Sequence, residues 1–386
     1  MKSVIVLGST GSVGSNVLSV IRDHPEDFRV AGLVAGMGGE KLAALAREFP
    51  DAAVALARDA DARAFADLLA NTKRAGRFYD APDGALELLA DIHADICVAA
   101  VSGTAGLELA FAAAARETRI LLANKEVLVS AGRLFMDAVR AGGSEVYPLD
   151  SEHTALWQCL ESKNRDEVEK LIITASGGPF RLWPAERIAG ATPEDALKHP
   201  VWRMGAKISV DSATLANKAL EVIEAHHLFG FAFDAMDILV HPQSAVHGIA
   251  EFVDGSLIAH MGICDMRQPI AYMLFHPRRR PNKLPRMDLA AIGRLDFERP
   301  DYKRFPMLPI GLEAGRRGGK FPALYNAANE AAVELFLARR LSFPGIARVV
   351  GAVMEEGEKG DFSGLDEVAA VHARARRRVL ELAANC

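Results

Sequence analysis

The stretch that decides the fold is "VIVLGSTGSVGSNVLSVI", residues 4–21. It begins with four apolar residues, continues through a loop containing Gly8, Gly11 and Gly14, and ends in an amphipathic helical pattern. Glycines allow a tight turn and a close backbone approach, and the N-terminus of the following helix offers free amides to a pyrophosphate. The spacing is GxxGxxG rather than GxGxxG, but a strand and a helix flank the loop as a nucleotide site requires. We therefore predict nucleotide binding here, with a purely structural turn as the alternative.

Short apolar runs and helical patterns alternate through the first 150 residues. The helical patterns include residues 40–49 and 62–72. The strand-like runs are rich in Val, Ile and Leu, and they are Val4–Leu7, Val30–Val34, Ile96–Val101, Ile120–Leu122 and Val146–Leu149. This alternation is typical of a parallel sheet covered by helices, so we predict an α/β domain over residues 1–150.

The pattern changes in the second half of the chain. An Asp254-Gly255 turn separates two strand-like runs within residues 251–262, which indicates a hairpin and hence a mixed or antiparallel sheet. Residues 322–340 and 366–386 are helical in pattern. We predict an α+β domain over residues 151–275, a linker over 276–301 and a helical domain over 302–386.

The segment HPRRRPNKLPRMD, residues 276–288, contains three prolines and five Lys or Arg residues. It could contact nucleic acid, but an exposed linker explains the same composition more simply. The net charge of the whole chain is −5, which also argues against a general nucleic-acid binder. We expect no nucleic-acid partner.

The cysteines indicate a reducing compartment, and the N-terminus and the apolar stretches indicate neither a signal peptide nor a membrane span. Four cysteines without CxxC spacing predict neither a disulfide framework nor a zinc knuckle, so we expect a cytoplasmic protein. The chain begins directly with a strand and the glycine loop, so we expect no signal peptide. The apolar stretch 96–115 is interrupted by polar residues and glycines, and we expect no membrane span.

Two acidic residues surround one serine in LDSEH, residues 149–153, where an apolar run ends. A solvated turn with a helix cap is one interpretation, and a metal or acid–base site is the other. Asp150 and Glu152 are two residues apart and could project to one side of an extended segment. Glu221 would add a third carboxylate, and three oxygen ligands with vacant positions suit Mg²⁺ or Mn²⁺.

The segment ANKALEVIEA, residues 216–225, is helical in pattern and places Asn217, Lys218 and Glu221 on one face. An exposed ion pair between Lys218 and Glu221 is the simpler alternative. Side chains that could donate to a phosphate are Ser176, Ser212, Asn217 and Lys218.

The end of the second strand, "LVAGMGGEK" at residues 33–41, has no acidic residue before Glu40. NAD-preferring sites usually carry an acid there to bind the ribose hydroxyls, so its absence favours NADP. No basic residue precedes Lys41, which keeps the preference for NADP modest.

Eight motifs, in order over residues 4–340, together resemble the 1-deoxy-D-xylulose 5-phosphate reductoisomerase family. They are LGSTGSVG, LLANKEVLVSAG, LDSEHTAL, SGGPF, HPVWRMGAKISVDSATLANKALEVIEA, HPQSAVH, DMRQPIAY and NAANEAAV. The resemblance implies a homodimer that uses NADPH and a divalent ion, Mg²⁺, Mn²⁺ or Co²⁺. Its expected reaction converts 1-deoxy-D-xylulose 5-phosphate to 2-C-methyl-D-erythritol 4-phosphate on the non-mevalonate route to isoprenoids. The implied fold has a Rossmann-like NADP-binding domain, a catalytic and dimerisation domain and a C-terminal helical domain.

The resemblance also implies roles for individual residues. The metal ligands are Asp150, Glu152 and Glu221, and these three with Lys125 are the catalytic residues. The substrate-binding residues are Lys125, Ser151, Glu152, Ser176, His199, Trp202, Ser212, Asn217, Lys218 and Glu221, with His199 and Trp202 in a lid. The cofactor-binding residues are Thr10, Gly11, Ser12, Val13, Gly36, Asn124, Glu126 and Gly205, with Met204 beside the nicotinamide.

Four residues at three places depart from the family pattern. A polar residue and Asn usually follow the glycine at 36, but Met37 and Gly38 stand there, which affects recognition of the 2′-phosphate. Ala219 replaces a usual Gly, which a helix tolerates because Ala is the better helix former. Cys264 replaces a common Pro, either as a small buried apolar residue or as a reactive thiol.

Two alternative functions share the glycine loop but have no need for three carboxylates. One is a metal-free Rossmann dehydrogenase acting on a semialdehyde or a sugar. The other is a regulator that binds NADP and a partner protein without turnover. Activity that survives chelation would indicate the first, and absence of product formation would indicate the second.

Overall fold

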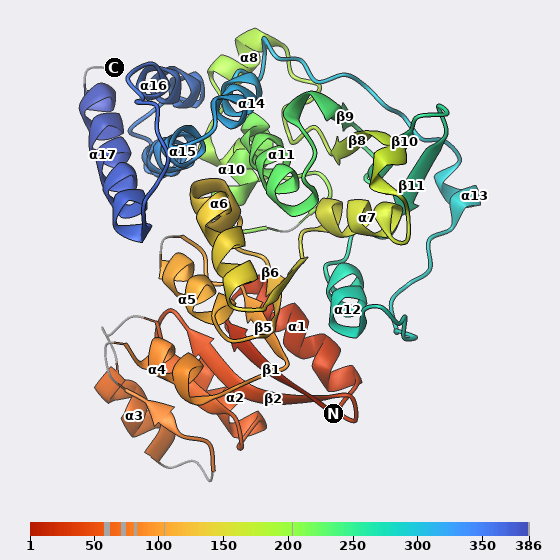
Figure 1. Cartoon of the computed structure of the whole chain (residues 1–386). Helices are drawn as coiled ribbons and strands as arrows, with labels where there is room; N and C mark the ends of the chain where they lie inside the picture. The colour runs from red at the N-terminus through yellow and green to blue at the C-terminus, as the bar shows by residue number, and fades with distance from the viewer. Residues whose placement is uncertain (58–61, 71–74, 81–82, 104, 203, 385–386) are drawn as a thin grey trace. The chain divides into compact units, whose positions relative to one another are not determined.

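The structure is a computed structural model, and it describes residues 1–57, 62–70, 75–80, 83–103, 105–202 and 204–384. The chain divides into two compact units. The first comprises Met1–Val127, Phe135–Asp150 and Asp265–Leu284, and the second comprises Leu128–Leu134, Ser151–Cys264 and Pro285–Cys386. The α/β class, with a parallel sheet, a separate mixed sheet and C-terminal helices, is confirmed (Figure 1). The finer domain boundaries stay a prediction.

The first unit is built on a seven-stranded parallel sheet in the order β4-β3-β2-β1-β5-β6-β7. Its strands are β1 (Lys2–Leu7), β2 (Phe28–Ala35), β3 (Ala53–Leu56), β4 (Phe78–Tyr79), β5 (Ile96–Ala99), β6 (Arg119–Leu122) and β7 (Glu145–Pro148). The strand order reverses between β1 and β5, and ligands of open α/β sheets bind at the carboxyl ends of strands at such a point. The sequence patterns did not predict β3 or β4, because β3 is half alanine, a residue depleted in strands, and β4 has only two residues.

Helices connect these strands, as parallel pairing requires. They are α1 (Ser12–Asp23), α2 (Glu40–Glu48), α3 (Ala62–Ala70), α4 (Gly84–Asp91), α5 (Ala105–Ala114) and α6 (Lys125–Ala141), with the late helix α12 (Arg267–Phe275). Residues 71–72 of the expected helix 62–72 lie outside the described residues. Although α12 comes late in the chain, it packs beside α1 (Figure 1). The ring of Phe275 lies 4.8 Å from that of Phe28, which ties α12 to the sheet.

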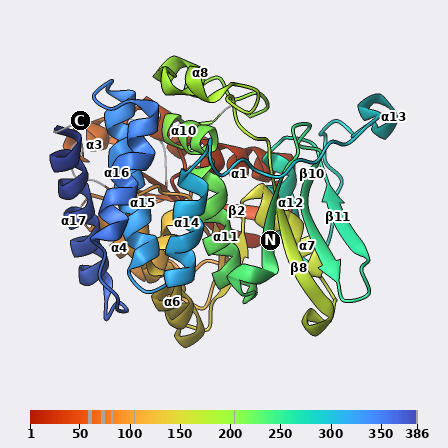
Figure 2. The same ribbon diagram turned by 90° about the horizontal axis from the view of Figure 1, so that it is seen from above.

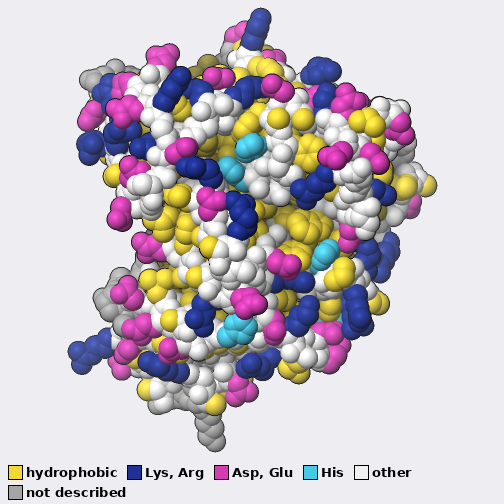
Figure 3. Space-filling model, in the orientation of Figure 1, with side chains coloured by type: hydrophobic (Ala, Val, Ile, Leu, Met, Phe, Trp, Pro, Cys, Tyr) yellow, Lys and Arg dark blue, Asp and Glu magenta, His cyan; other side chains and the backbone are white. Residues whose placement is uncertain are grey.

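Part of the basic segment is held on the first unit by ion pairs. Arg280 lies 3.1 Å from Asp27, and Lys283 lies 2.6 Å from Asp23. The basic residues are nevertheless exposed, as expected of a surface connection. On the face shown in Figure 3, Lys and Arg side chains are interspersed with Asp and Glu, and neither sign forms a single large patch.

The second unit contains a four-stranded mixed sheet in the order β11-β10-β8-β9. Its strands are β8 (Val168–Ala175), β9 (Met236–Val240), β10 (Val246–Phe252) and β11 (Leu257–Met261). The predicted hairpin is confirmed, since β10 and β11 are antiparallel and Gly255 in their turn has a φ of 81°. The helix α7 (Ser151–Leu160) packs on β8, β10 and β11.

Helices make up the rest of the second unit. They are α8 (Ala185–Ala189), α9 (Pro193–Ala196), α10 (Ala206–Thr214), α11 (Ala216–Phe229), α13 (Leu289–Ile292), α14 (Met307–Arg317), α15 (Phe321–Leu337), α16 (Phe343–Glu355) and α17 (Leu365–Ala384). Figure 2 shows α14, α15, α16 and α17 side by side, and α14 also packs on α11. Ala219 of α11 is fully buried at this crossing, and a Cβ on Gly311 would lie 2.5 Å from its side chain. The glycine at 311 therefore makes room for the alanine at 219.

Among the described residues, we find no helix with the length and apolar character that a bilayer crossing requires.

Candidate active site

The glycine loop of the first unit joins β1 to α1 at the reversal point of the sheet. Gly8 has a φ of 87°, and a Cβ there would lie 2.4 Å from the carbonyl oxygen of Ala100, which follows β5. A Cβ on Gly14 would lie 2.3 Å from the carbonyl oxygen of Gly8. Gly11 is the N-cap of α1 and makes no side-chain capping bond. The first amides of α1, from Ser12 and Val13, are thus placed to bind an anion.

The start of α6 adds buried polar groups to the first unit. Asn124 caps this helix, accepting a hydrogen bond from the amide of Val127 at 3.3 Å and donating to the carbonyl of Gly103 at 3.3 Å. It therefore fixes the loop after β5 against the helix start. The neighbouring Lys125 donates from Nζ to the carboxylate of Asp150, and both side chains are largely shielded from solvent.

A buried lysine between two glutamates forms the centre of the second unit. Lys218 Nζ lies 2.6 Å from Glu152 Oε1 and 2.7 Å from Glu221 Oε2. Only 6% of Lys218 and 1% of Glu221 is exposed, and Asn217 also donates to Glu221. The exposed ion pair considered for Lys218 and Glu221 is therefore wrong. Two buried acids around one cation are costly unless the charges stay balanced, which points to ligand binding more than to stability.

Glu152 lies in a helix, which corrects the expectation of an extended segment. The helix α7 begins at Ser151, directly after β7, and Glu152 occupies its first turn. A carboxylate is favourable there because it faces the positive end of the helix dipole. Ser151 donates from its hydroxyl to Glu152, and His153 Nε2 donates to the Glu221 carbonyl at 2.8 Å. This last bond holds α7 against α11.

Two phosphate-binding candidates are brought together by a glycine pair after β8. Gly178 has a φ of 67°, and a Cβ there would lie 2.7 Å from the carbonyl oxygen of Ser212. The loop that carries Ser176 therefore approaches the end of α10 as closely as backbone allows. Leu215 has a φ of 61° and turns α10 into α11, so Ser212 is followed at once by Asn217 and Lys218. Left-handed backbone at a bulky residue is strained and often marks a functional site.

His199 holds Ser176 in place from the loop before α10. Its Nδ1 accepts the amide hydrogens of Val201 at 3.2 Å and Trp202 at 2.9 Å, so the proton is on Nε2 and is donated to Ser176 Oγ at 2.9 Å. Burial and the charge of Lys218 lower the pKa of His199 to about 4, although Glu152 opposes this shift. His199 is therefore a neutral donor at neutral pH.

The loop itself, residues 199–205, has no regular structure where it is described, which agrees with its sequence. Trp202 is half-buried, with its ring 6.5 Å from that of His247. Gly205 is the N-cap of α10.

A buried contact that the sequence did not indicate anchors α10. Asp211, next to Ser212 and 1% exposed, accepts hydrogen bonds from Asn329 Nδ2 at 2.7 Å and Lys207 Nζ at 2.8 Å. Asn329 lies in the NAANE motif of α15, so this C-terminal helix fixes Asp211, the neighbour of the phosphate-binding candidate Ser212. The available signal was an acid at an otherwise apolar helix position, but a partner 118 residues away leaves no local pattern.

Another departure from the family pattern, Cys264, is partly buried. Burial, with a contribution from Glu152, raises the pKa of its thiol to about 11, and Sγ donates to the Ser244 carbonyl at 3.3 Å. The thiol is therefore protonated and poorly nucleophilic.

The expected site residues fall into both units. The first unit contains Thr10, Gly11, Ser12, Val13, Gly36, Asn124, Lys125, Glu126 and Asp150. The second contains Ser151, Glu152, Ser176, His199, Trp202, Met204, Gly205, Ser212, Asn217, Lys218 and Glu221. Within each unit the contacts above connect most of these residues, and their roles stay predictions.

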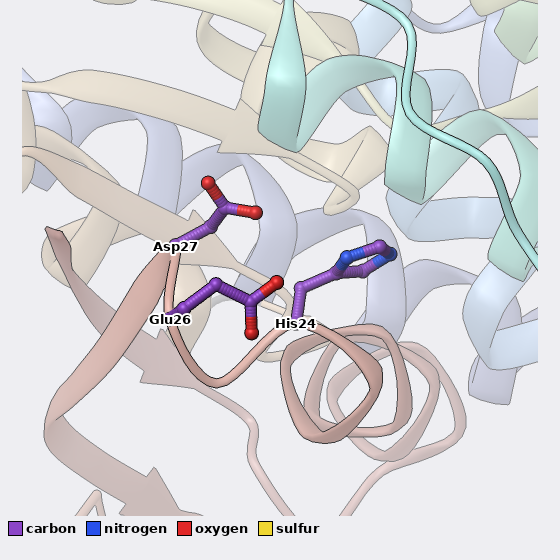
Figure 4. A group of neighbouring side chains, drawn as sticks. All are labelled: His24, Glu26 and Asp27. Carbon is purple, nitrogen blue, oxygen red and sulfur yellow. The ribbon is translucent and has the colours of Figure 1, made fainter.

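A second group of possible ligands lies in the turn between α1 and β2. His24, Glu26 and Asp27 have ligand atoms within 4.8 Å of one another (Figure 4). However, Arg280 already neutralises Asp27, and Glu26 is exposed. We assign no metal to this group.

The parallel sheet with its glycine loop and the buried acid–lysine cluster define an oxidoreductase of the dinucleotide-binding class with a candidate cation site. Family models described as 1-deoxy-D-xylulose 5-phosphate reductoisomerase match residues 4–132, and models of its C-terminal domains match residues 146–229 and 261–378. The chain belongs to the 1-deoxy-D-xylulose 5-phosphate reductoisomerase family.

Individual relatives agree over the full length. The proteins of that name from Ralstonia nicotianae and Pelotomaculum thermopropionicum are each 46% identical, covering 100% and 95% of this chain and 99% and 95% of their own. The structure of the Zymomonas mobilis enzyme in complex with NADPH is 40% identical, covers 99% of each chain and has a TM-score of 0.92. Another reductoisomerase structure, with NADPH, fosmidomycin and magnesium, is 35% identical, covers 99% of this chain and 98% of its own, and has a TM-score of 0.93.

Proposed function

We propose that this chain converts 1-deoxy-D-xylulose 5-phosphate to 2-C-methyl-D-erythritol 4-phosphate, using NADPH and a divalent ion. The observation that carries this proposal is the buried arrangement in which Glu152 and Glu221 share the ammonium of Lys218. Family membership supports the reaction, and this arrangement supports the centre we propose for it.

Asp150, Glu152 and Glu221 are our proposed ligands for Mg²⁺ or Mn²⁺. Glu152 and Glu221 already converge on one cation, and Asp150 precedes Glu152 by only two residues in the chain. Carboxylate oxygens are the donors that these ions prefer. Asn217 Oδ1 is buried without a hydrogen-bond partner among the described residues, so the cluster can accept a donor from a ligand. The residues therefore fit the ion.

Ser176, Ser212, Asn217 and Lys218 are our proposed phosphate ligands. The Gly178 approach brings the Ser176 loop to Ser212, and the turn at Leu215 leads directly into the start of α11. Hydroxyl, amide and ammonium donors at one place are suited to a phosphoryl group. Phosphate bound there is positioned away from the reacting carbons and can help close residues 199–205 over the substrate.

The chemistry divides between bound groups and side chains. The bound cation supplies Lewis-acid stabilisation of substrate oxygens, and NADPH supplies the hydride. Glu152 moves a hydroxyl proton of the substrate, and Lys125 stabilises the negative charge that develops. The lid residues His199 and Trp202 exclude water.

The first unit fits NADPH through its backbone. The uncapped start of α1 offers amides for the pyrophosphate, and Gly8 and Gly14 allow the loop to pack closely. Thr10 to Val13 would hold the phosphates, and Gly36, at the end of β2, would face the adenosine ribose.

We also propose a cytoplasmic homodimer. Within the described part of the chain, the strand β11 pairs only with β10, and its Leu257 and Ile258 are 59% and 38% exposed. An exposed apolar edge is a template for association, here with a second copy of the chain. Cys97, Cys159 and Cys264 are free thiols, as expected in a reducing compartment. Light scattering should give twice the chain mass, and Leu257→Glu should lower it.

The direct test is an assay of the purified chain with 1-deoxy-D-xylulose 5-phosphate and NADPH. We expect oxidation of NADPH and formation of 2-C-methyl-D-erythritol 4-phosphate, both lost after chelation and restored by Mg²⁺ or Mn²⁺. Activity unaffected by exhaustive chelation would instead support a metal-free dehydrogenase, and no turnover of any kind would overturn the proposal.

A further inference from the structure

The end of β2 lacks the residues that the family resemblance places beside the adenosine ribose. No acidic side chain follows Ala35 before Glu40, so nothing there favours the 2′-hydroxyl of NAD. Gly38 stands where an Asn is usual, and a Cβ at this position would lie 2.7 Å from Cβ of the buried Phe65. The packing of α3 thus excludes any side chain at position 38, and a preference for NADPH needs another group.

Among the described residues, Lys41 is a cation that contacts the glycine loop from the segment after β2. It lies in the first turn of α2, is exposed, and donates from Nζ to the carbonyl oxygen of Thr10. This bond links the first turn of α2, which follows β2, to the glycine loop. The 2′-phosphate lies beyond the end of β2 when the pyrophosphate binds at the loop. An ammonium has three N–H donors, and among the described residues we find only this one in use.

The neighbouring acid does not cancel the charge of Lys41. Glu40 precedes it in the chain but pairs with Arg47, at 2.8 Å between Oε2 and a guanidinium nitrogen. Arg47 lies in the last turn of α2 and compensates the charge of this carboxylate. Among the described residues, Glu40 therefore does not pair with Lys41.

We propose that Lys41 binds the 2′-phosphate of NADPH and is the residue that selects NADPH over NADH in this chain. The inference rests on the proposed use of NADPH. It adds the residue that takes over from the missing polar pair at positions 37 and 38. A doubly charged phosphate gains a charge-assisted hydrogen bond from Lys41, whereas the hydroxyl of NADH gains much less.

The test is equilibrium titration of the purified chain with NADPH and with NADH, by calorimetry and without substrate. Lys41→Gln should weaken NADPH binding about tenfold or more and leave NADH binding within about twofold. Lys41→Arg should retain most of the preference. Raising the salt concentration should weaken NADPH binding less in Lys41→Gln than in the unaltered chain, because one ion pair is already missing.

Arg29→Gln is the matched control. Arg29 is exposed and lies near the other end of β2, about 20 Å from Ala35 at 3.3 Å per residue. Arg29→Gln removes the same charge as Lys41→Gln and should leave the affinities for NADPH and NADH unchanged. If Lys41→Gln kept its preference for NADPH, or bound both dinucleotides equally more weakly, the role of Lys41 would be overturned. The proposed function of the chain would still stand. If the unaltered chain bound neither dinucleotide, the proposed function itself would fail.

Discussion

The glycine loop after β1 and the cluster shared by α7 and α11 are both suited to charged ligands, but they are built by opposite means. The loop offers backbone amides at the uncapped start of α1, and its essential residues are glycines. The cluster offers charged side chains, with Lys218 held between Glu152 and Glu221. Backbone geometry forms the first, and a balance of buried charge forms the second.

This difference predicts how each region responds to substitution. In the loop, an added methyl group destroys a close backbone approach, so folding and cofactor binding fail together. In the cluster, an isosteric change of charge preserves the packing and removes the ligand, so chemistry fails while the fold survives. Measuring stability and function separately therefore distinguishes the two kinds of site.

The largest effect on activity should come from Glu221→Gln. The amide keeps the size of the carboxylate but lacks the charge that a divalent ion requires, so kcat/KM should fall at least about 1,000-fold. Lys218 keeps Glu152 as a partner, so thermal unfolding should change little. Calorimetric titration with Mn²⁺ should show weakened binding.

Glu169→Gln is the control, because Glu169 is an exposed acid of β8 in the same unit. It should leave both activity and Mn²⁺ binding unchanged. Normal turnover in Glu221→Gln would remove Glu221 from the site and, with it, the contrast drawn above.

Gly8→Ala should combine a loss of stability with a loss of NADPH binding. Its Cβ would lie 2.4 Å from the Ala100 carbonyl at a φ of 87°, so the loop or β5 must shift. We expect a cost of roughly 2–4 kcal/mol, from backbone strain and overpacking together. Gly190→Ala is the control, because Gly190 has a φ of −98° and its Cβ would meet nothing closer than 3.9 Å. Equal stability of the two variants would show that the loop is adaptable.

The sequence predicted the loop because all of its determinants are local. A strand, three glycines and a helix lie within 18 consecutive residues, and the hairpin at Asp254-Gly255 is equally local. The sequence also indicated the candidate acids, but it did not indicate how deeply they are buried or which residues contact them. Whether Lys218 and Glu221 face solvent or a core depends on α7, whose Glu152 and His153 contact them from another part of the chain.

The errors have the same origin. Glu152 was expected in an extended segment because Asp150 ends a strand, yet α7 begins one residue later. The contact between Asp211 and Asn329 and the approach of Gly178 to Ser212 join segments separated by 118 and 34 residues. Such pairs follow from tertiary packing, which one sequence does not specify position by position.

Trp202→Ala should have a smaller effect, on activity only. Trp202 is half-buried in the irregular loop before α10, so its loss should cost less than about 1 kcal/mol of stability, against 3–5 kcal/mol for a core Trp. If the loop closes over the substrate, kcat/KM should fall about 10- to 100-fold. Trp183→Ala is the control, because Trp183 packs on Phe180 and Arg187 in the same unit and should leave activity unchanged. Unfolding of Trp202→Ala would place this residue in the core instead of a lid.

The last expected effect is of pH on stability, and it tests whether α11 depends on buried neutral groups as well as on balanced charges. Burial, with the neighbouring His226, lowers the pKa of His227 to about 4 from an ordinary value of 6.5. The unfolded chain therefore takes up a proton first, so this contribution to stability is complete above pH 6.5 and is lost as the pH falls toward 4. Between pH 7.5 and pH 5 the loss should be about 2 kcal/mol. Urea unfolding at the two pH values should show that the free energy of unfolding changes by about 2 kcal/mol less in His227→Gln, because glutamine has no proton to gain. If the free energy of unfolding depended on pH equally in both chains, His227 would be hydrated in the folded chain. The core around α11 would then tolerate a positive charge on this side chain.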